Sequence, residues 1–221
     1  MPERSTVELN PDKTVAYHVV AAILSGLSRL LFRPTVTGQE NIPLEGPVLI
    51  APIHRSNVDF AFTLFISPRK VFFMAKDGIF KFAPFGRLLV HLGAFPIHRG
   101  ATTDRDSMNS AQEVLRQGQA LVLFPEGTRK EGPLVGPLQD GAMFIAARTG
   151  ATVVPVGIAG SDRALPLGAK LPRLVRIRIV IGAPITPPTS EGRVSRSAIT
   201  AKTEELRQGL QAAYDEALRA S

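Results

Sequence analysis

The chain has 221 residues, of which 44% are hydrophobic and 20% charged, so it can bury a core of one domain and is too apolar for a disordered protein. It contains no cysteine, which excludes disulfides, thiol nucleophiles and thiolate metal sites. The formal net charge of +7 favours anionic partners such as anionic lipid or phosphorylated substrates and coenzymes. Aromatic residues make up only 6% of the chain, so we do not expect nucleic-acid binding by base stacking.

The first element is an apolar run at residues 14–32, which is nearly as long as a membrane span. Polar residues interrupt it, among them His18 and Arg29. A helix lying in the plane of the membrane interface fits these interruptions better than a spanning helix or a buried core helix. We therefore divide the chain into an N-terminal tail and membrane-associating helix at 1–33 and a single domain at 34–221.

Short apolar strands alternate with helices along the rest of the chain. We expect strands at residues 48–51, 70–76, 94–97, 120–124, 151–160 and 173–182, and helices at 57–66, 79–93, 104–117, 141–150 and 195–219. The strand at 173–182 alternates apolar and basic residues, which is typical of a half-exposed strand that could form an edge of the sheet. The overall pattern predicts an α/β fold with a mainly parallel sheet flanked by helices.

Active sites in such sheets lie beyond the carboxyl ends of the strands, and a histidine follows the first expected strand. Asp59 comes five residues after this histidine, His54, across a loop that leads into a helix. A carboxylate bonded to one ring nitrogen fixes the tautomer of a histidine that acts as a general base. The pair could therefore deprotonate a substrate hydroxyl directly. One alternative is a histidine that only caps the helix. A metal ligand is a weaker alternative, because the sequence has no other cluster of histidines or acids spaced as metal ligands.

The sequence FPEGTR follows another buried strand and forms a compact candidate for anion binding. Gly127 permits unusual backbone dihedrals, and Arg129 can bind a phosphate through two hydrogen bonds. Glu126 could hold a hydroxyl or brace Arg129. The plain alternative is a surface turn with an ordinary salt bridge. Arg99 and Lys76 follow neighbouring strands, although each taken alone is more often a solvated charge.

Four motifs occur together in order: HRSNVD, GAFPIHR, FPEGTR and VVPVGI. With them the chain resembles the glycerophospholipid acyltransferases, and most closely the 1-acylglycerol-3-phosphate acyltransferases, from about residue 32 to residue 185. The first and third motifs are highly specific as a pair. One departure is Ile53, at a position where the family often has asparagine before the histidine.

The resemblance implies the glycerolipid acyltransferase fold and a reaction. His54 would be the general base and Asp59 would orient it. The free hydroxyl of 1-acylglycerol-3-phosphate would attack the thioester of acyl-CoA or acyl carrier protein and form phosphatidic acid, with no cofactor or metal. The resemblance also implies a substrate-binding set, in which Arg99 and Arg129 bind the acceptor phosphate: Lys76, Arg99, Glu126, Gly127, Thr128 and Arg129.

The substrates also imply where the enzyme works. Lysophospholipids partition into bilayers and the donor is soluble, so the resemblance predicts a peripheral or monotopic protein on the cytoplasmic face of the cell membrane, at a surface with anionic lipid.

Three alternative functions remain. The acceptor could be glycerol-3-phosphate, another lysophospholipid or a glycosylated lipid. A hydrolase using Ser56 or Ser110 would lack a nucleophile elbow, and a non-catalytic membrane-surface protein would not need the full set of motif residues.

Overall fold

The computed structural model describes residues 12–63, 66–67, 69–76, 86, 93–97, 103–166, 168–169, 171–189 and 193–220. Its helices are α1 (Asp12–Phe32), the 3-10 helix η1 (Gln39–Asn41), α2 (Asp59–Phe62), α5 (Thr103–Arg116), α6 (Gly141–Thr149), α7 (Ser161–Ala164) and α8 (Arg196–Arg219). Its strands are β1 (Thr35–Thr37), β2 (Val48–Pro52), β3 (Val71–Lys76), β4 (Ala94–Ile97), β5 (Ala120–Val122), β6 (Thr152–Ala159) and β7 (Arg178–Ile181).

The strands form one sheet in the order β1-β7-β6-β2-β5-β3-β4. Every pair is parallel except β6 with β7, which run antiparallel. The central strand β2 pairs with β5 on one side and β6 on the other, so that Leu49 lies opposite both Leu121 and Val153. The prediction of a mainly parallel α/β fold is confirmed.

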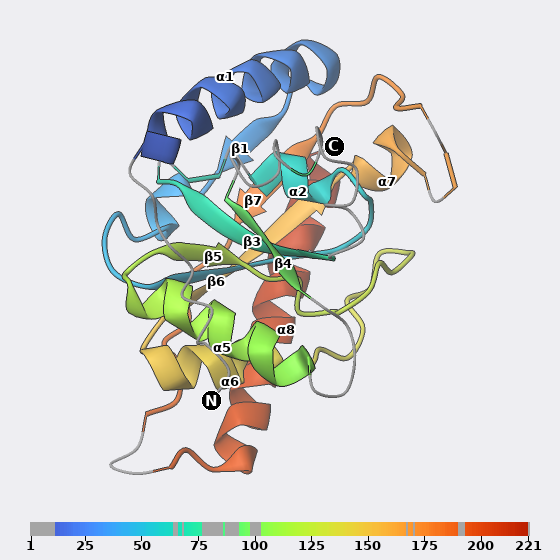
Figure 1. Ribbon diagram of the computed structural model, residues 1–221. Helices are drawn as coiled ribbons and strands as arrows, with labels where there is room; N and C mark the ends of the chain where they lie inside the picture. The colour runs from blue at the N-terminus through green and yellow to red at the C-terminus, as the bar shows by residue number, and fades with distance from the viewer. Residues whose placement is uncertain are drawn as a thin grey trace.

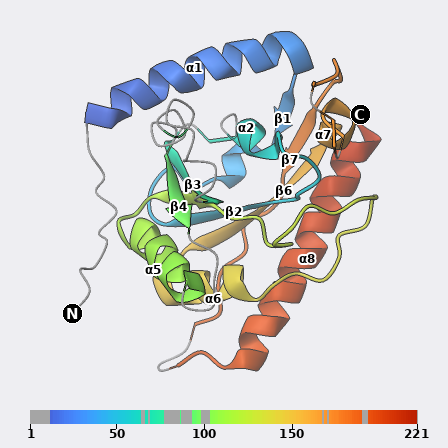
Figure 2. The ribbon, with the colours of Figure 1, turned by 45° about the vertical axis from the view of Figure 1, so that its right-hand side comes forward.

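Helices cover both faces of this sheet (Figures 1 and 2). Alternate side chains of a strand point to opposite faces, and Leu49 packs in one hydrophobic cluster while Val48 and Ile50 pack in the other. α5, α6 and α8 pack on the first face. On the other face Phe32, at the end of α1, meets Phe62 of α2 edge-on with ring centroids 5.5 Å apart.

Three expectations differ from the structure. The strand expected to form an edge, β7, is internal, because β1 pairs with its outer side and is itself a strand that the sequence did not indicate. The helix expected at 57–66 is shorter, since α2 spans only Asp59–Phe62. The helix expected at 79–93 lies outside the described residues except for two glycines.

The remaining expected helices and strands are present to within a few residues. α6 ends at Gly150, which adopts a left-handed conformation with φ of 69° at the position where glycine commonly ends a helix. α8 begins after Ser195, whose hydroxyl accepts a hydrogen bond from the amide of Ala198. No helix in the part of the chain that the structure describes is long and apolar enough to cross a membrane.

Candidate active site

The carboxyl end of β2 leads directly to the histidine singled out by the sequence. The Nδ1 atom of His54 lies 3.0 Å from Oδ2 of Asp59, the first residue of α2. Because an ionised carboxylate can only accept hydrogen bonds, Nδ1 carries the proton and Nε2 is left as an acceptor. The side chain of His54 is 21% exposed while that of Asp59 is fully buried. The ring can therefore reach a substrate while its partner stays out of water.

Backbone amides of the loop between β2 and α2 hold the carboxylate of Asp59 in place. Its Oδ2 also accepts hydrogen bonds from the amides of Arg55 and Ser56, each at 2.7 Å. The side chain thus takes up backbone donors of the turn that precedes α2 and fixes the path from β2 into that helix. The ring of His54 stacks on Phe124, which follows β5, with centroids 4.2 Å apart. Two neighbouring strands thereby position the imidazole.

A buried ion pair, which the sequence did not indicate, ties the loops after β2 and β5 together. Arg55 donates from Nη1 to both carboxylate oxygens of Glu126, at 2.9 and 2.8 Å. Oε2 of Glu126 also accepts the amide of His54 at 3.0 Å. The sequence left Glu126 to hold a hydroxyl or to brace Arg129, and the structure pairs it with Arg55 instead. The only signal that could have pointed to Arg55 was its position next to His54.

The other donors of Arg55 are also occupied. Nε donates to the carbonyl of Gly132 and Nη2 to that of Leu134. The guanidinium lies 5.3 Å from the centroid of the Tyr214 ring of α8. Burial raises the pKa of the Tyr214 hydroxyl, so this group stays neutral near pH 7. Arg55 is therefore a structural brace of the site and is not exposed to a ligand.

The rest of the FPEGTR loop turns outward. Gly127 has a φ of 71°, a left-handed conformation that other residues adopt only with strain, so this position favours glycine. Thr128 and Arg129 are exposed. Among the described residues Arg129 has no side-chain hydrogen bond or ion pair, which leaves its guanidinium accessible to an anion.

Lys76 and Arg99 are the two remaining residues that the sequence predicted for the site. Lys76 is the last residue of β3, which pairs with β5, but its side chain lies outside what the structure describes. Arg99 lies outside the described residues altogether. The structure thus brings His54, Asp59, Glu126 and Gly127 together and leaves Thr128 and Arg129 on the surface of the same loop. Within the described ranges, no three histidine or acidic side chains gather into a group that could hold a metal ion.

Comparison with known proteins agrees with this geometry. The model of the Acyltransferase family matches residues 33–159, which include the histidine, its carboxylate and the FPEGTR loop. The chain belongs to this acyltransferase family.

Relatives of this acyltransferase carry a more specific name. It is 30% identical over 173 residues to the 1-acyl-sn-glycerol-3-phosphate acyltransferase BAT2 of Brassica napus, a match that covers 76% of this chain and 50% of that protein. It is 28% identical to LPAT1 of Arabidopsis thaliana, with 80% of this chain and 50% of that protein covered. The chain thus spans about half the length of these relatives.

A solved structure shows the same fold. The crystal structure of the 1-acyl-sn-glycerophosphate acyltransferase PlsC from Thermotoga maritima superposes with a TM-score of 0.77 at 23% identity and covers 99% of this chain and 86% of that one.

The family model ends at the last residue of β6, so α8 of this acyltransferase lies beyond the matched range. α8 nevertheless supports the site, since the amide of Val135 donates to the Gln211 side chain at 2.7 Å.

Proposed function

We propose that this acyltransferase moves a fatty acyl group from acyl-CoA or acyl carrier protein to the free hydroxyl of 1-acylglycerol-3-phosphate, forming phosphatidic acid. The observation that carries this proposal is the pair of His54 and Asp59, 3.0 Å apart, beside a loop that exposes Arg129. The names of the relatives from Brassica napus and Arabidopsis thaliana support the choice of acceptor.

The reaction needs one base and no covalent acyl-enzyme intermediate. Nε2 of His54 takes the proton of the acceptor hydroxyl as the oxygen attacks the thioester carbonyl carbon. The new C–O bond gives a tetrahedral intermediate, which collapses with cleavage of the C–S bond. The thiolate leaves and takes the proton back from His54, while Asp59 stabilises the transient imidazolium. A thioester is already activated, so the absence of cysteine from this chain is no obstacle.

The acceptor phosphate would be bound where the FPEGTR loop turns outward. Arg129 offers a planar guanidinium that can make two parallel hydrogen bonds to a phosphate. Gly127 lets the loop turn and Thr128 offers a hydroxyl beside it. We propose that Lys76, the last residue of β3, and Arg99, which comes after β4 in the sequence, complete this site. Glu126 contributes indirectly, because it holds Arg55 and the amide of His54.

A membrane surface is the third element of the proposal. Four apolar side chains of α1 are between 50% and 76% exposed: Val19, Ile23, Leu27 and Leu30. Their spacing of three to four residues places them along one side of the helix. Unsupported apolar stripes of this kind are typical of helices that lie on a lipid surface. The segment 1–33 is thus proposed as membrane-associating and 34–221 as the acyltransferase domain.

A second exposed segment lies near the C-terminal end of α1. Leu171 and Leu174 are 80% and 77% exposed, and Arg173 and Arg176 are exposed beside them. This segment leads into β7, and the amide of Ile177 donates to the carbonyl of Phe32 at 3.1 Å. Figures 1 and 2 both draw the segment beside the end of α1. Exposed leucines interspersed with arginines suit a membrane surface with anionic lipid. Because the acyl donor is soluble, we propose that this surface is the cytoplasmic face of the membrane.

The experiment that tests the function measures release of the CoA thiol from acyl-CoA, with and without 1-acylglycerol-3-phosphate. We expect release by the wild type that depends on the acceptor and is lost in His54→Ala, with the fold of the variant checked by circular dichroism. Release without an acceptor would indicate a thioesterase and contradict the proposal. Glycerol-3-phosphate and other lysophospholipids, measured alongside, would reveal a different acceptor if one of them were the faster substrate.

A further inference from the structure

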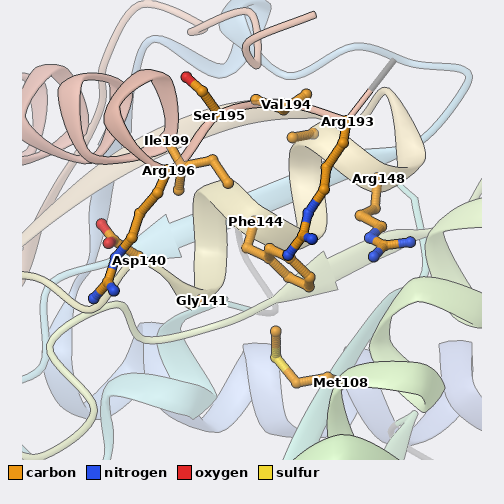
Figure 3. A pocket seen from close by; sticks show the side chains of 11 residues that line it. Met108, Asp140, Gly141, Phe144, Arg148, Arg193, Val194, Ser195, Arg196 and Ile199 are labelled. Atoms are coloured by element: carbon orange, nitrogen blue, oxygen red, sulfur yellow. The ribbon is translucent and has the colours of Figure 1, made fainter. Parts of the chain in front are cut away.

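A pocket of about 1010 Å³ lies between α5, α6 and the start of α8 (Figure 3). Ligand sites for small molecules are commonly a few hundred to about a thousand Å³, so this one is large enough for an extended ligand. Of the residues assigned above to the acyl-transfer chemistry, none whose side chain the structure describes lines it. The residues that decide what it can bind are Met108, Asp140, Phe144, Arg148, Arg193 and Arg196.

The lining is strongly basic for its size. Three arginines line the pocket, one from α6, one from the segment before α8 and one from the first residue of α8. Arg148 and Arg193 lie near Phe144, and Arg196 lies on the other side of the pocket, beside Asp140 (Figure 3). Among the described residues that line the pocket the only acid is Asp140, and its Oδ2 already accepts a hydrogen bond from the Thr200 hydroxyl at 3.1 Å. No ion pair joins these arginines to an acid in the described part of the chain. Three guanidinium groups at one opening favour a ligand with several phosphate oxygens.

The pocket also offers a flat apolar surface. The guanidinium of Arg148 lies 5.2 Å from the centroid of the Phe144 ring, and Met108 of α5 lies across the opening from that ring (Figure 3). An arginine held over an aromatic ring, with a polarisable thioether facing it, is a suitable surface for a planar heterocycle. The lining therefore suits a ligand that combines phosphates with an aromatic base.

The position of the pocket relates it to the candidate active site. Asp140 and Gly141, at its rim, directly follow Gln139. The amide of Gln139 donates to the carbonyl of Pro125, and its side chain is the nearest group to a Cβ placed at Gly127. One rim of the pocket thus adjoins the FPEGTR loop. α5 and α6 lie on the face of the sheet away from α1 (Figures 1 and 2), so a ligand would enter from the water rather than from a membrane at α1.

We propose that this pocket binds the 3′-phospho-ADP portion of an acyl-CoA donor, with its phosphates on the three arginines and its adenine against Phe144. The proposal rests on the proposed acyl transfer and selects coenzyme A, rather than an acyl carrier protein, as the carrier. A concave site with an arginine–aromatic pair recognises a nucleotide, whereas a carrier protein would be met by a broad basic surface. The pantetheine arm would then run past the FPEGTR loop toward His54.

The test measures binding directly, by calorimetry with free coenzyme A and with 3′-dephospho-coenzyme A. Removing one charge-assisted hydrogen-bond donor by Arg193→Gln should weaken coenzyme A binding about ten-fold, and adding Arg148→Gln should weaken it about ten-fold more. The wild type should bind dephospho-coenzyme A more weakly than coenzyme A.

Arg219→Gln, the same change at the exposed far end of α8, is the matched control and should bind coenzyme A like the wild type. The KM for acyl-CoA should rise in the arginine variants while the KM for the acceptor stays constant.

The outcomes separate this proposal from the proposed function. Wild-type affinity for coenzyme A in the double variant would overturn the pocket assignment and leave acyl transfer intact. A wild type that transfers acyl groups only from acyl carrier protein and does not bind coenzyme A would also overturn it. Arginine-dependent binding of coenzyme A without acyl transfer to any glycerolipid acceptor would support the pocket and contradict the proposed function.

Discussion

Asp59 contacts the candidate base through a single oxygen, Oδ2, which also accepts the amides of Arg55 and Ser56. In Asp59→Asn the amide keeps the size of the side chain but can present a donor where the imidazole needs an acceptor. His54 would then lose its fixed tautomer and its stabilised imidazolium. We expect turnover to fall by about a thousand-fold or more, by analogy with carboxylates that orient a catalytic histidine.

The measurement is kcat with saturating donor and acceptor, together with the unfolding transition of the same variant. A variant that stays folded at the assay temperature and retains more than about a tenth of the wild-type kcat would contradict an orienting role for Asp59.

Arg55 and Glu126 form an ion pair with side-chain exposures of only 1% and 0%. Removing one partner leaves the other charge buried without compensation, which typically costs about 3–5 kcal/mol. Arg55→Ala should therefore lower the free energy of unfolding by about that amount. Arg129→Ala, at an exposed arginine of the loop that carries Glu126, should change it by less than about 0.5 kcal/mol and raise the KM for the phosphorylated acceptor.

Urea denaturation of both variants tests this contrast. Replacing both partners with apolar residues, as in Arg55→Met with Glu126→Leu, should restore a part of the stability that either single change removes. Equal losses in Arg55→Ala and Arg129→Ala would mean that the buried pair does not hold the loops together.

Helices and strands that contain a long run of apolar residues could be predicted from the sequence, and those without such a run could not. The core strands β2 and β6 read as apolar runs, and the serine and glycine at the ends of α8 and α6 mark where these helices begin and end. β1 is only three residues long and mostly exposed, so it carries no pattern of its own and forms because β7 offers it a partner.

The candidate site shows the same division between local and distant contacts. His54 and Asp59 are five residues apart, so their meeting across a turn could be anticipated. Arg55 and Glu126 are 71 residues apart, and they meet only because β2 and β5 are neighbours in the sheet. Local spacing does not encode that adjacency, so Arg55 was not among the partners that the sequence suggested for Glu126.

Gly157 of β6 allows α8 to pack closely on the sheet. A Cβ at Gly157 would lie 2.4 Å from the backbone of Ala213 and 2.5 Å from the amide of Tyr214. Backbone atoms cannot move aside singly, so Gly157→Ala should push α8 away and lower the free energy of unfolding by about 1–3 kcal/mol or more. Because Tyr214 lies under the guanidinium of Arg55, the activity should fall as well.

Gly136→Ala is the matched control, since nothing lies within 4 Å of a Cβ at that position. It should leave stability unchanged or raise it slightly, because alanine lowers the entropy of the unfolded chain. Equilibrium denaturation compares the two variants, and equal stabilities would show that α8 can shift away from β6 without cost.

At the scale of the whole molecule, the two proposed binding surfaces lie on opposite faces of the sheet. The exposed stripe of α1 and the segment before β7 are on one side, and the arginine-lined pocket between α5, α6 and α8 is on the other (Figures 1 and 2). The carboxyl edge of the sheet, where His54 lies, connects these two sides. A lipid acceptor from the membrane and a soluble donor from the water could thus reach the same base without competing for one entrance.

This arrangement predicts which face of the bound protein meets lipid. The chain has no cysteine, so single variants such as Leu30→Cys in α1 and Ala201→Cys in α8 accept a fluorescent label at one position only. On vesicles that contain anionic lipid and a quencher attached to the acyl chains, the label at position 30 should be quenched because its side chain is buried in the interface. The label at position 201, an exposed position near the pocket, should keep its fluorescence and stay accessible to a water-soluble quencher.

Raising the salt concentration should release the protein from the vesicles and remove the difference in quenching between the two labels, since screening weakens the attraction between the basic segment and the lipid. Quenching at position 201 with none at position 30 would place the membrane on the opposite face and would require donor and acceptor to enter the site from the same side.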